Sequence, residues 1–175
     1  MRADAERNRA AILAVAGRLI CEEKHDNASM DDIAAAAGVG KGTLFRRFSD
    51  REGLIRALFD ERTGSAWTEV SALAADAAVP VRERITAFVA SVFDLTVIEL
   101  PPLMRALPEG CRSETWAPWR ALLAELISQA APDADAEFLA ITIFASMRPE
   151  IIDMISPQRH RDGVLELTVR TIGTS

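Results

Sequence analysis

The chain has 175 residues, of which 49% are apolar and 26% are charged, so it can bury a sizeable core and disorder is excluded over most of its length. Its two cysteines, Cys21 and Cys111, form neither a disulfide framework nor a zinc-ligand spacing, and we expect no metal and no cofactor. No apolar run is long enough for a membrane span, and the N-terminal stretch is unlike a secretory signal, so we expect a soluble cytoplasmic protein.

The net charge of −6 is unevenly distributed. Residues 1–60 contain ten basic and ten acidic residues, whereas residues 61–175 contain ten basic and sixteen acidic ones. Four cations of the first part, Lys41, Arg46, Arg47 and Arg51, fall within eleven residues that contain a single acid. A local basic patch of this kind can bind phosphates even in an acidic protein.

The first third of the chain has a helical pattern with glycine punctuation. Apolar residues at helical spacing predict a first helix over about residues 5–23, followed by a polar loop. Ser29 and Asp32 resemble a capping box at the start of a second helix, over about 30–37. Gly38 ends that helix, and a third helix is predicted over about 41–47.

A fourth helix is predicted over about 51–75, with Asp50 as its N-cap and an apolar stripe that includes Leu54 and Leu58. All eight prolines lie at or after Pro80. Between Ile85 and Leu100, apolar residues cover two faces of a helix, which predicts that this helix is buried.

The rest of the chain is also predicted to be helical. Three prolines near residue 105 divide the chain into short pieces, and further helices fit 113–131 and 134–155, the second kinked at Pro149. Residues 165–172 fit a strand as well as a helix, and we favour the helix because no partner strand is visible. We therefore predict an all-α fold.

The segment from Ser29 to Phe48 has the residue types of a helix-turn-helix. Ile33 and Ala37 would face inward, the small Ala34 permits close approach of the helices, and Gly38 can adopt a positive φ at the turn. Val39, Leu44 and Phe48 would supply apolar groups from the second helix. Its opposite face then carries Lys41, Thr43, Arg46 and Arg47, which suits a helix in the major groove of DNA. The alternative is an ordinary helical hairpin with a glycine turn.

Residues 8–60 resemble the N-terminal domain of TetR/AcrR-family transcriptional repressors. The resemblance lies in the stretch ending at Ala16 and in the segments Ser29-Met-Asp-Asp-Ile-Ala34, Gly38-Val-Gly-Lys-Gly-Thr-Leu-Phe-Arg-Arg-Phe48 and Arg51-Glu-Gly-Leu54. It implies a homodimer that places two reading helices on a palindromic operator. It also implies a division into a helix-turn-helix DNA-binding domain, 1–50, and a helical effector-binding and dimerisation domain, 51–175.

The resemblance also supplies candidate DNA contacts. Thr43, Arg46 and Arg47 would face bases or nearby phosphates, and Lys41 and Ser29 would contact the backbone. The N-terminus of the fourth helix, near Arg51, would face a phosphate. The full candidate set is Ser29, Lys41, Gly42, Thr43, Phe45, Arg46, Arg47 and Arg51. Where the family often has tyrosine, histidine and serine, this chain has Phe45, Arg47 and Gly40, so the preferred DNA sequence stays open.

The second domain offers candidate apolar sites. Aromatic and methionine side chains could line a pocket for an apolar or amphipathic small molecule, although each could equally be plain core; these are Phe88, Phe93, Met104, Trp116, Trp119, Phe144 and Met147. Asp94 and Glu99 could bind a cation or simply face solvent. Apolar residues of the last two helices could form a dimer interface of four helices or belong to the core; these are Phe138, Ile141, Ile152, Leu165 and Val169.

The sequence favours a ligand-responsive repressor released from DNA by a small molecule. An enzyme is disfavoured because His25 and His160 have no nucleophile motif beside them and are expected to be solvated. A helical ligand-binding or adaptor protein without DNA-binding activity is the alternative. The effector, the operator, the regulated genes and the choice between repression and activation are not determined by the sequence.

Overall fold

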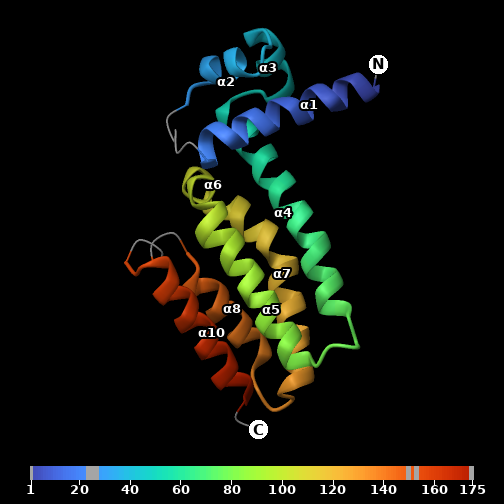
Figure 1. Ribbon diagram of the computed structural model, residues 1–175, viewed down its shortest axis with the longest axis vertical. Helices are drawn as coiled ribbons and strands as arrows, with labels where there is room; N and C mark the ends of the chain where they lie inside the picture. Colours follow the sequence, from blue (N-terminus) through green and yellow to red (C-terminus); the bar gives the residue numbers. More distant parts are fainter. Residues whose placement is uncertain (1, 23–27, 149–150, 152–153, 174–175) are drawn as a thin grey trace. The chain divides into compact units, whose positions relative to one another are not determined.

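The computed structural model describes residues 2–22, 28–148, 151 and 154–173 (Figure 1). Every regular element in these residues is a helix, so the predicted all-α fold is confirmed. The ambiguous last segment is helical too, as predicted. Among the described residues, no helix combines the length and the apolar character that crossing a membrane requires.

The first five elements follow the expected order. They are α1 (Arg2–Gly17), η1 (Arg18–Glu22), α2 (Met30–Ala36), α3 (Lys41–Phe48) and α4 (Arg51–Ala75). The first predicted helix corresponds to α1 together with η1, which is a turn of π-helix. Residues 23–27 of the predicted polar loop lie outside the described residues.

Six further helices of the described chain follow Pro80. They are α5 (Val81–Phe93), η2 (Asp94–Glu99), α6 (Pro101–Ala106), α7 (Glu109–Ala130), α8 (Ala136–Ser146) and α10 (Pro157–Gly173). The element η2 is again π-helical. The short α6 has prolines in its first turn, where the missing N–H of proline costs no intrahelical bond.

Two sequence-based expectations about helix ends are wrong. The helix predicted over 134–155 ends at Ser146, and Met147 is its C-cap. A proline disfavours helical backbone in the preceding residue and clashes with the carbonyl four residues earlier, so the helix stops before Pro149. The kink predicted at Pro149 itself lies outside the described residues. The helix predicted to start at 113 starts at Glu109, so Pro118 lies in its interior.

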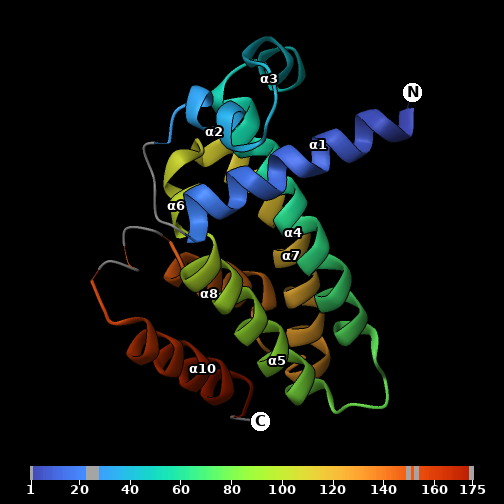
Figure 2. The ribbon, with the colours of Figure 1, turned by 45° about the horizontal axis from the view of Figure 1, so that its top comes forward.

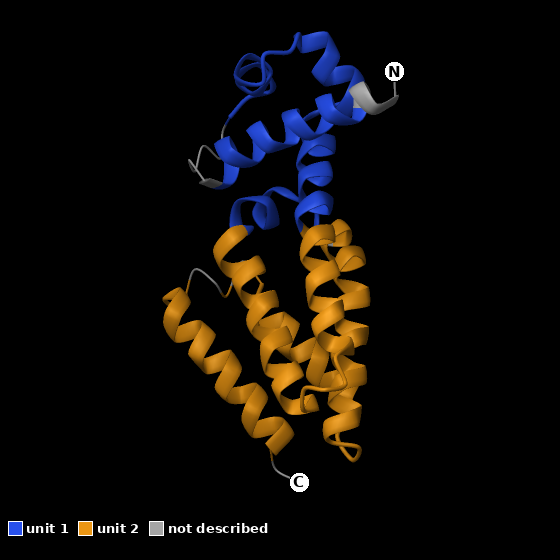
Figure 3. Cartoon of the chain, turned by 45° about the vertical axis from the view of Figure 1, so that its right-hand side comes forward, with its two compact units in different colours: residues 1–62, 100–108 blue, residues 63–99, 109–175 orange. Residues whose placement is uncertain are grey.

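The chain divides into two compact units (Figure 3). Unit 1 comprises residues 1–62 and 100–108, and unit 2 comprises residues 63–99 and 109–175. Each unit has its own apolar core. In unit 1 the fully buried side chains include Ile12, Leu13, Ile33, Leu44 and Leu54; in unit 2 they include Ile85, Phe88, Val92, Phe93 and Leu123. The predicted burial of the helix after Pro80 is therefore confirmed for its apolar positions on α5.

Candidate nucleic-acid interface

The start of α2 is fixed by a capping box. The Ser29 hydroxyl oxygen accepts a hydrogen bond from the Asp32 backbone N–H at 3.2 Å, and the Asp32 carboxylate accepts one from the Ser29 backbone N–H at 2.9 Å. Two backbone N–H groups that an isolated helix would leave without acceptors are thereby satisfied. Aspartate thus performs the role that glutamate usually has in this motif, as the sequence predicts.

The turn between α2 and α3 depends on Gly38. Its φ is +64°, in the left-handed region that glycine adopts at little cost, as predicted. The Gly38 N–H donates to the Ala35 carbonyl at 3.2 Å, and the Val39 N–H donates to the Ala34 carbonyl at 3.0 Å. These bonds satisfy the last carbonyls of α2, so the chain can reverse and begin α3 within a few residues.

The facing sides of α2 and α3 form a small apolar core (Figure 2). Ile33 and Leu44 are fully buried, and Ala34 and Phe48 are 5% exposed. These side chains are the ones predicted to face inward. Ala37, also predicted to face inward, is only half-buried because it is the C-cap of α2.

The opposite side of α3 is exposed and cationic. Lys41, Gly42, Phe45 and Arg46 are exposed, while Thr43 and Arg47 are half-buried. Within the described part of the chain, neither the Arg46 nor the Arg47 guanidinium forms an ion pair. Both are therefore available to a polyanion.

Lys41 has an internal partner that the sequence does not reveal. Its Nζ lies 2.8 Å from the Asp31 carboxylate and 5.8 Å from the centre of the Phe45 ring. Asp31 and Lys41 are ten residues apart on two different helices, and only the turn at Gly38 brings them together. Their side chains are 61% and 62% exposed, so this ion pair contributes little stability and is readily exchanged.

The predicted backbone contacts Ser29 and Arg51 lie next to each other in unit 1. Arg51 is half-buried, and its Nε donates to the carbonyl of Ala28 at 3.4 Å. The Ser29 hydroxyl donates to the Asp32 carboxylate at 2.6 Å. Both side chains therefore have structural roles at the start of α2, and their contacts to DNA stay predictions.

Residues 12–58 match the family model described as bacterial regulatory proteins, tetR family. This match contains the capping box, the turn and the exposed face of α3. Residues 12–58 are therefore similar to the DNA-binding region of TetR-family regulators.

A curated relative is similar over a longer stretch of the chain. The HTH-type transcriptional regulator SAR0097 of Staphylococcus aureus (strain MRSA252) is 34% identical over 96 residues, which are 54% of this chain and 50% of that protein. The chain thus spans about half the length of this curated relative.

Two solved structures share the fold of this chain over most of its length. FadR from Bacillus subtilis, in complex with stearoyl-CoA, has a TM-score of 0.71 at 18% identity and covers 91% of this chain and 97% of its own. AibR, in complex with isovaleryl coenzyme A and operator DNA, has a TM-score of 0.65 at 23% identity, with 91% and 97% covered. At these identities the likeness concerns the fold alone.

Four of the seven candidate pocket residues form one aromatic cluster in unit 2. Trp119 lies 6.3 Å from Phe88 and 5.1 Å from Trp116 between ring centres, and Trp116 lies 6.0 Å from Phe144. Trp67, which the sequence analysis did not select, completes the cluster at 5.1 Å from Trp119. Three of these contacts are edge-on and the one with Phe144 is tilted, and the central rings of Phe88, Trp116 and Trp119 are buried, which is typical of a packed core.

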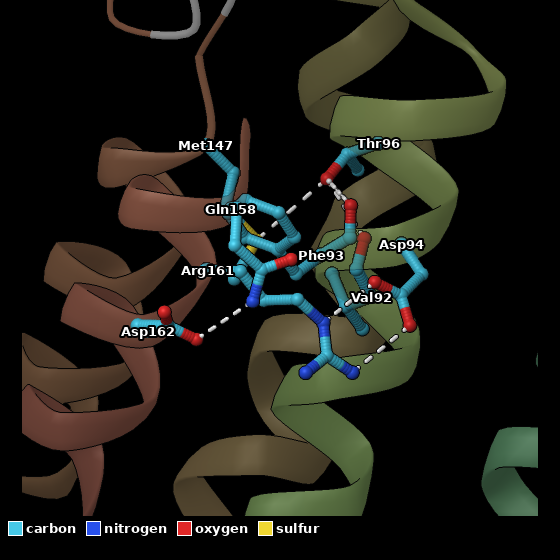
Figure 4. A network of polar contacts seen from close by, with 8 residues as sticks. All are labelled: Val92, Phe93, Asp94, Thr96, Met147, Gln158, Arg161 and Asp162. Carbon is cyan, nitrogen blue, oxygen red and sulfur yellow. Dashed lines mark hydrogen bonds and ion pairs between the residues drawn. The ribbon is translucent and has the colours of Figure 1, made fainter. Parts of the chain in front are cut away.

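The other three candidates lie elsewhere. Phe93 packs edge-on against His160, with ring centres 5.0 Å apart. The Met147 sulfur accepts a hydrogen bond from the buried Thr96 hydroxyl at 3.7 Å (Figure 4). Met104 belongs to α6 in unit 1. The seven residues therefore do not share one site.

The expectation that His160 is solvated is wrong. Its side chain is 5% exposed, and neither ring nitrogen has a hydrogen-bond partner in the described residues. It lies on the side of α10 that packs against α5, which the pattern of a single helix does not indicate. His25 lies outside the described residues.

Asp94 has a protein partner. The Arg161 Nε and Nη2 donate to the two oxygens of Asp94 at 2.9 and 3.1 Å, which ties α10 to the end of α5 (Figure 4). The hydrogen bond that Arg161 donates to Asp94 raises the pKa of Arg161 above its ordinary value, so this guanidinium stays charged. A cationic ligand is not needed to neutralise Asp94, and Glu99 is exposed.

Proposed function

We propose that this protein is a DNA-binding transcriptional regulator in which α3 enters the major groove of an operator. The observation that carries the proposal is the two-sided character of α3. One side of the helix is buried through Leu44 and Phe48. The opposite side carries the cationic side chains of Lys41, Arg46 and Arg47. A helix held rigidly on one side and cationic on the other can read base edges while neighbouring groups contact phosphates.

The candidate contacts have different roles in this proposal. Arg46, exposed and without an ion pair, is suited to bidentate hydrogen bonding with guanine. Thr43 and Arg47, which are half-buried, would contact bases or phosphates at the edge of the helix. Lys41 would exchange Asp31 for a phosphate, and Gly42 would let the phosphate backbone approach closely. Phe45 would make an apolar contact, and Ser29 and Arg51 would contact phosphates.

We also propose that the protein acts as a homodimer on a palindromic operator. Unit 2 carries exposed apolar side chains on two helices: Phe138 and Ile141 on α8 are 62% and 48% exposed, and Leu167 on α10 is 47% exposed. Apolar patches of this kind mark interaction sites. Of the residues predicted for the interface, Leu165 is half-buried, Val169 is 50% exposed and Ile152 lies outside the described residues.

The remaining parts of the proposal concern response and location. Residues 51–175 would bind a small molecule that releases DNA, so that the protein acts as a repressor, while residues 1–50 would bind the operator. FadR and AibR were each solved with an acyl-CoA, which supports a small-molecule effector. The curated relative is a transcriptional regulator, which supports a protein that is not an enzyme. A cytoplasmic location stays a prediction.

A mobility-shift assay tests the DNA-binding function. The wild-type chain should form a salt-sensitive complex with the region upstream of its own gene or with a site selected from a random pool. Arg46→Ala and Arg47→Ala should each weaken that complex by about 1–3 kcal/mol, whereas Arg159→Ala, an exposed change on α10, should leave it unchanged.

Two results would contradict the proposal. The first is the absence of any specific complex at moderate salt, which would favour a ligand-binding or adaptor protein. The second is an equal effect of all three substitutions, which would mean that α3 does not face the DNA.

A further inference from the structure

A cavity of about 650 Å³ that is open to solvent along one side lies in unit 2 between the end of α4, the following loop, α5 and α10. Its volume falls in the range of small-molecule sites. Most of the lining is apolar, and the polar lining residues lie on α5 and α10. The apolar lining residues are Leu73, Val79, Ala87, Ala90, Leu165, Val169 and Ile172, and the polar ones are Arg82, Glu83, Thr86 and Arg161.

This cavity is elongated because α5 and α10 run antiparallel along it. At one end, the Arg82 Nη1 lies 3.6 Å from the position that a Cβ on Gly173 would take. At the other end, Arg161 is bound to Asp94. Arg82 to Asp94 and Arg161 to Gly173 each span twelve residues, about 18 Å of helix. The cavity therefore has an arginine at each end and an apolar wall between them.

The arginines have unused hydrogen-bonding capacity. The Arg82 side chain forms neither an ion pair nor a hydrogen bond within the described residues. Arg161 uses Nε and Nη2 on Asp94, and its Nη1 donates to no acceptor in the described part of the chain (Figure 4). Arg82 also lies in the first turn of α5, where backbone N–H groups and the helix dipole favour an anion. Glu83 is the single carboxylate of the lining, and its negative charge would weaken the binding of an anion at Arg82.

We propose that this cavity binds an elongated aliphatic carboxylate, with its carboxylate at Arg82 and its chain along the apolar wall toward Arg161. The apolar residues would cover one side of the aliphatic chain, and the guanidinium supplies paired donors that match a carboxylate. This proposal names the chemical class of the small molecule that we propose above as the effector. Only the regulatory role of the ligand rests on the proposed function; its binding to the cavity does not.

A second copy of the chain is a less suitable occupant. Leu165 and Val169, which the sequence also offered for a dimer interface, line the cavity instead, whereas Leu167, one of the exposed side chains that we propose for the dimer, does not. Side chains two positions apart in an α-helix point in directions about 160° apart, so the two surfaces lie on different sides of α10. The cavity thus stays open in the proposed dimer.

Calorimetric titration of the full chain with dodecanoate, in the absence of DNA, tests the proposal. Arg82→Gln should weaken binding by about tenfold, because a charge-assisted hydrogen bond is lost. Glu83→Gln should strengthen binding, since it removes the opposing charge. Arg159→Gln, which makes the same charge change on α10 outside the cavity, should leave binding unchanged. Dodecyltrimethylammonium, with the opposite charge on the same chain, should bind more weakly than dodecanoate.

Ala87→Trp fills the cavity from α5 and should abolish dodecanoate binding while leaving the circular dichroism spectrum and the oligomeric state unchanged. The proposal is overturned if dodecanoate does not bind the wild-type chain, if Ala87→Trp binds it as tightly, or if Arg82→Gln and Arg159→Gln have equal effects. It is also overturned if Ala87→Trp changes the oligomeric state, because the cavity would then be a contact between copies. None of these results depends on DNA binding, so a failed operator assay and a failed ligand assay are distinguishable.

Discussion

The glycine of the Arg51-Glu-Gly-Leu54 segment is required by a close backbone approach. A Cβ added at Gly53 would lie 2.1 Å from the carbonyl oxygen of Phe48, which is far inside van der Waals contact. The Gly53 N–H also donates to the Asp50 carboxylate at 2.8 Å, which caps α4 as predicted. The end of α3 is thereby held against the start of α4. The sequence shows that residue 53 is a glycine, but only the structure shows that the carbonyl of Phe48 leaves no room for a side chain there.

Gly53→Ala should therefore lower the free energy of unfolding by about 1–3 kcal/mol, as an overpacked site does. Gly64→Ala is the matched control, because Gly64 lies inside α4 with nothing within 4 Å of its added Cβ. This second change should raise the free energy of unfolding by roughly 0.5–1 kcal/mol through the gain in helix propensity. Chemical denaturation measures both, and effects of the same sign would refute the explanation.

At the scale of helices, the ion pair between Asp94 and Arg161 joins two elements whose residues are 67 positions apart. It is bidentate, and its side chains are 40% and 31% exposed. The pair between Glu166 and Arg170 has side chains that are 62% and 76% exposed and lies within one helix. We expect the pair between Asp94 and Arg161 to stabilise the fold more than the pair between Glu166 and Arg170. It is bidentate, and solvent screens its less exposed charges less strongly.

Arg161→Gln should lower the free energy of unfolding by about 1 kcal/mol, whereas Arg170→Gln should change it by less than about 0.5 kcal/mol. Thermal or urea unfolding at moderate salt measures the difference. Equal losses for the two variants would show that the connection between α5 and α10 does not depend on the Asp94 pair.

At the scale of the whole molecule, the proposed homodimer makes a prediction of its own. Phe138→Asp and Ile141→Asp place a charge in the middle of the proposed apolar interface, so both should convert the dimer to a monomer. Ile98→Asp is the control, because Ile98 is 57% exposed but lies on η2 rather than on α8. Size-exclusion chromatography with light scattering measures the mass. A wild-type monomer, or a dimer that survives both substitutions, would contradict the interface.

Much of unit 1 could be predicted because its determinants are local. The capping box joins residues three apart, the positive φ at the turn depends on the single residue Gly38, and the inward side of α3 follows from helical spacing. Unit 2 was predicted less completely. Its helices were recognised from their periodicity, but periodicity does not say which helix covers which side. The aromatic residues chosen as pocket candidates consequently include a packed cluster, while the cavity beside Arg82 was not anticipated.

The sequence by itself determined the all-helical fold, the helix-turn-helix and the family resemblance, because these depend on interactions between residues close together in the chain. Only the tertiary structure decided which partner each side chain meets: Asp31 for Lys41, Arg161 for Asp94, and Phe93 for the buried His160. Such pairs form when separate helices pack together. The pattern within one helix sets which of its sides is apolar, but the packing of the other helices decides whether that side becomes core, cavity or surface.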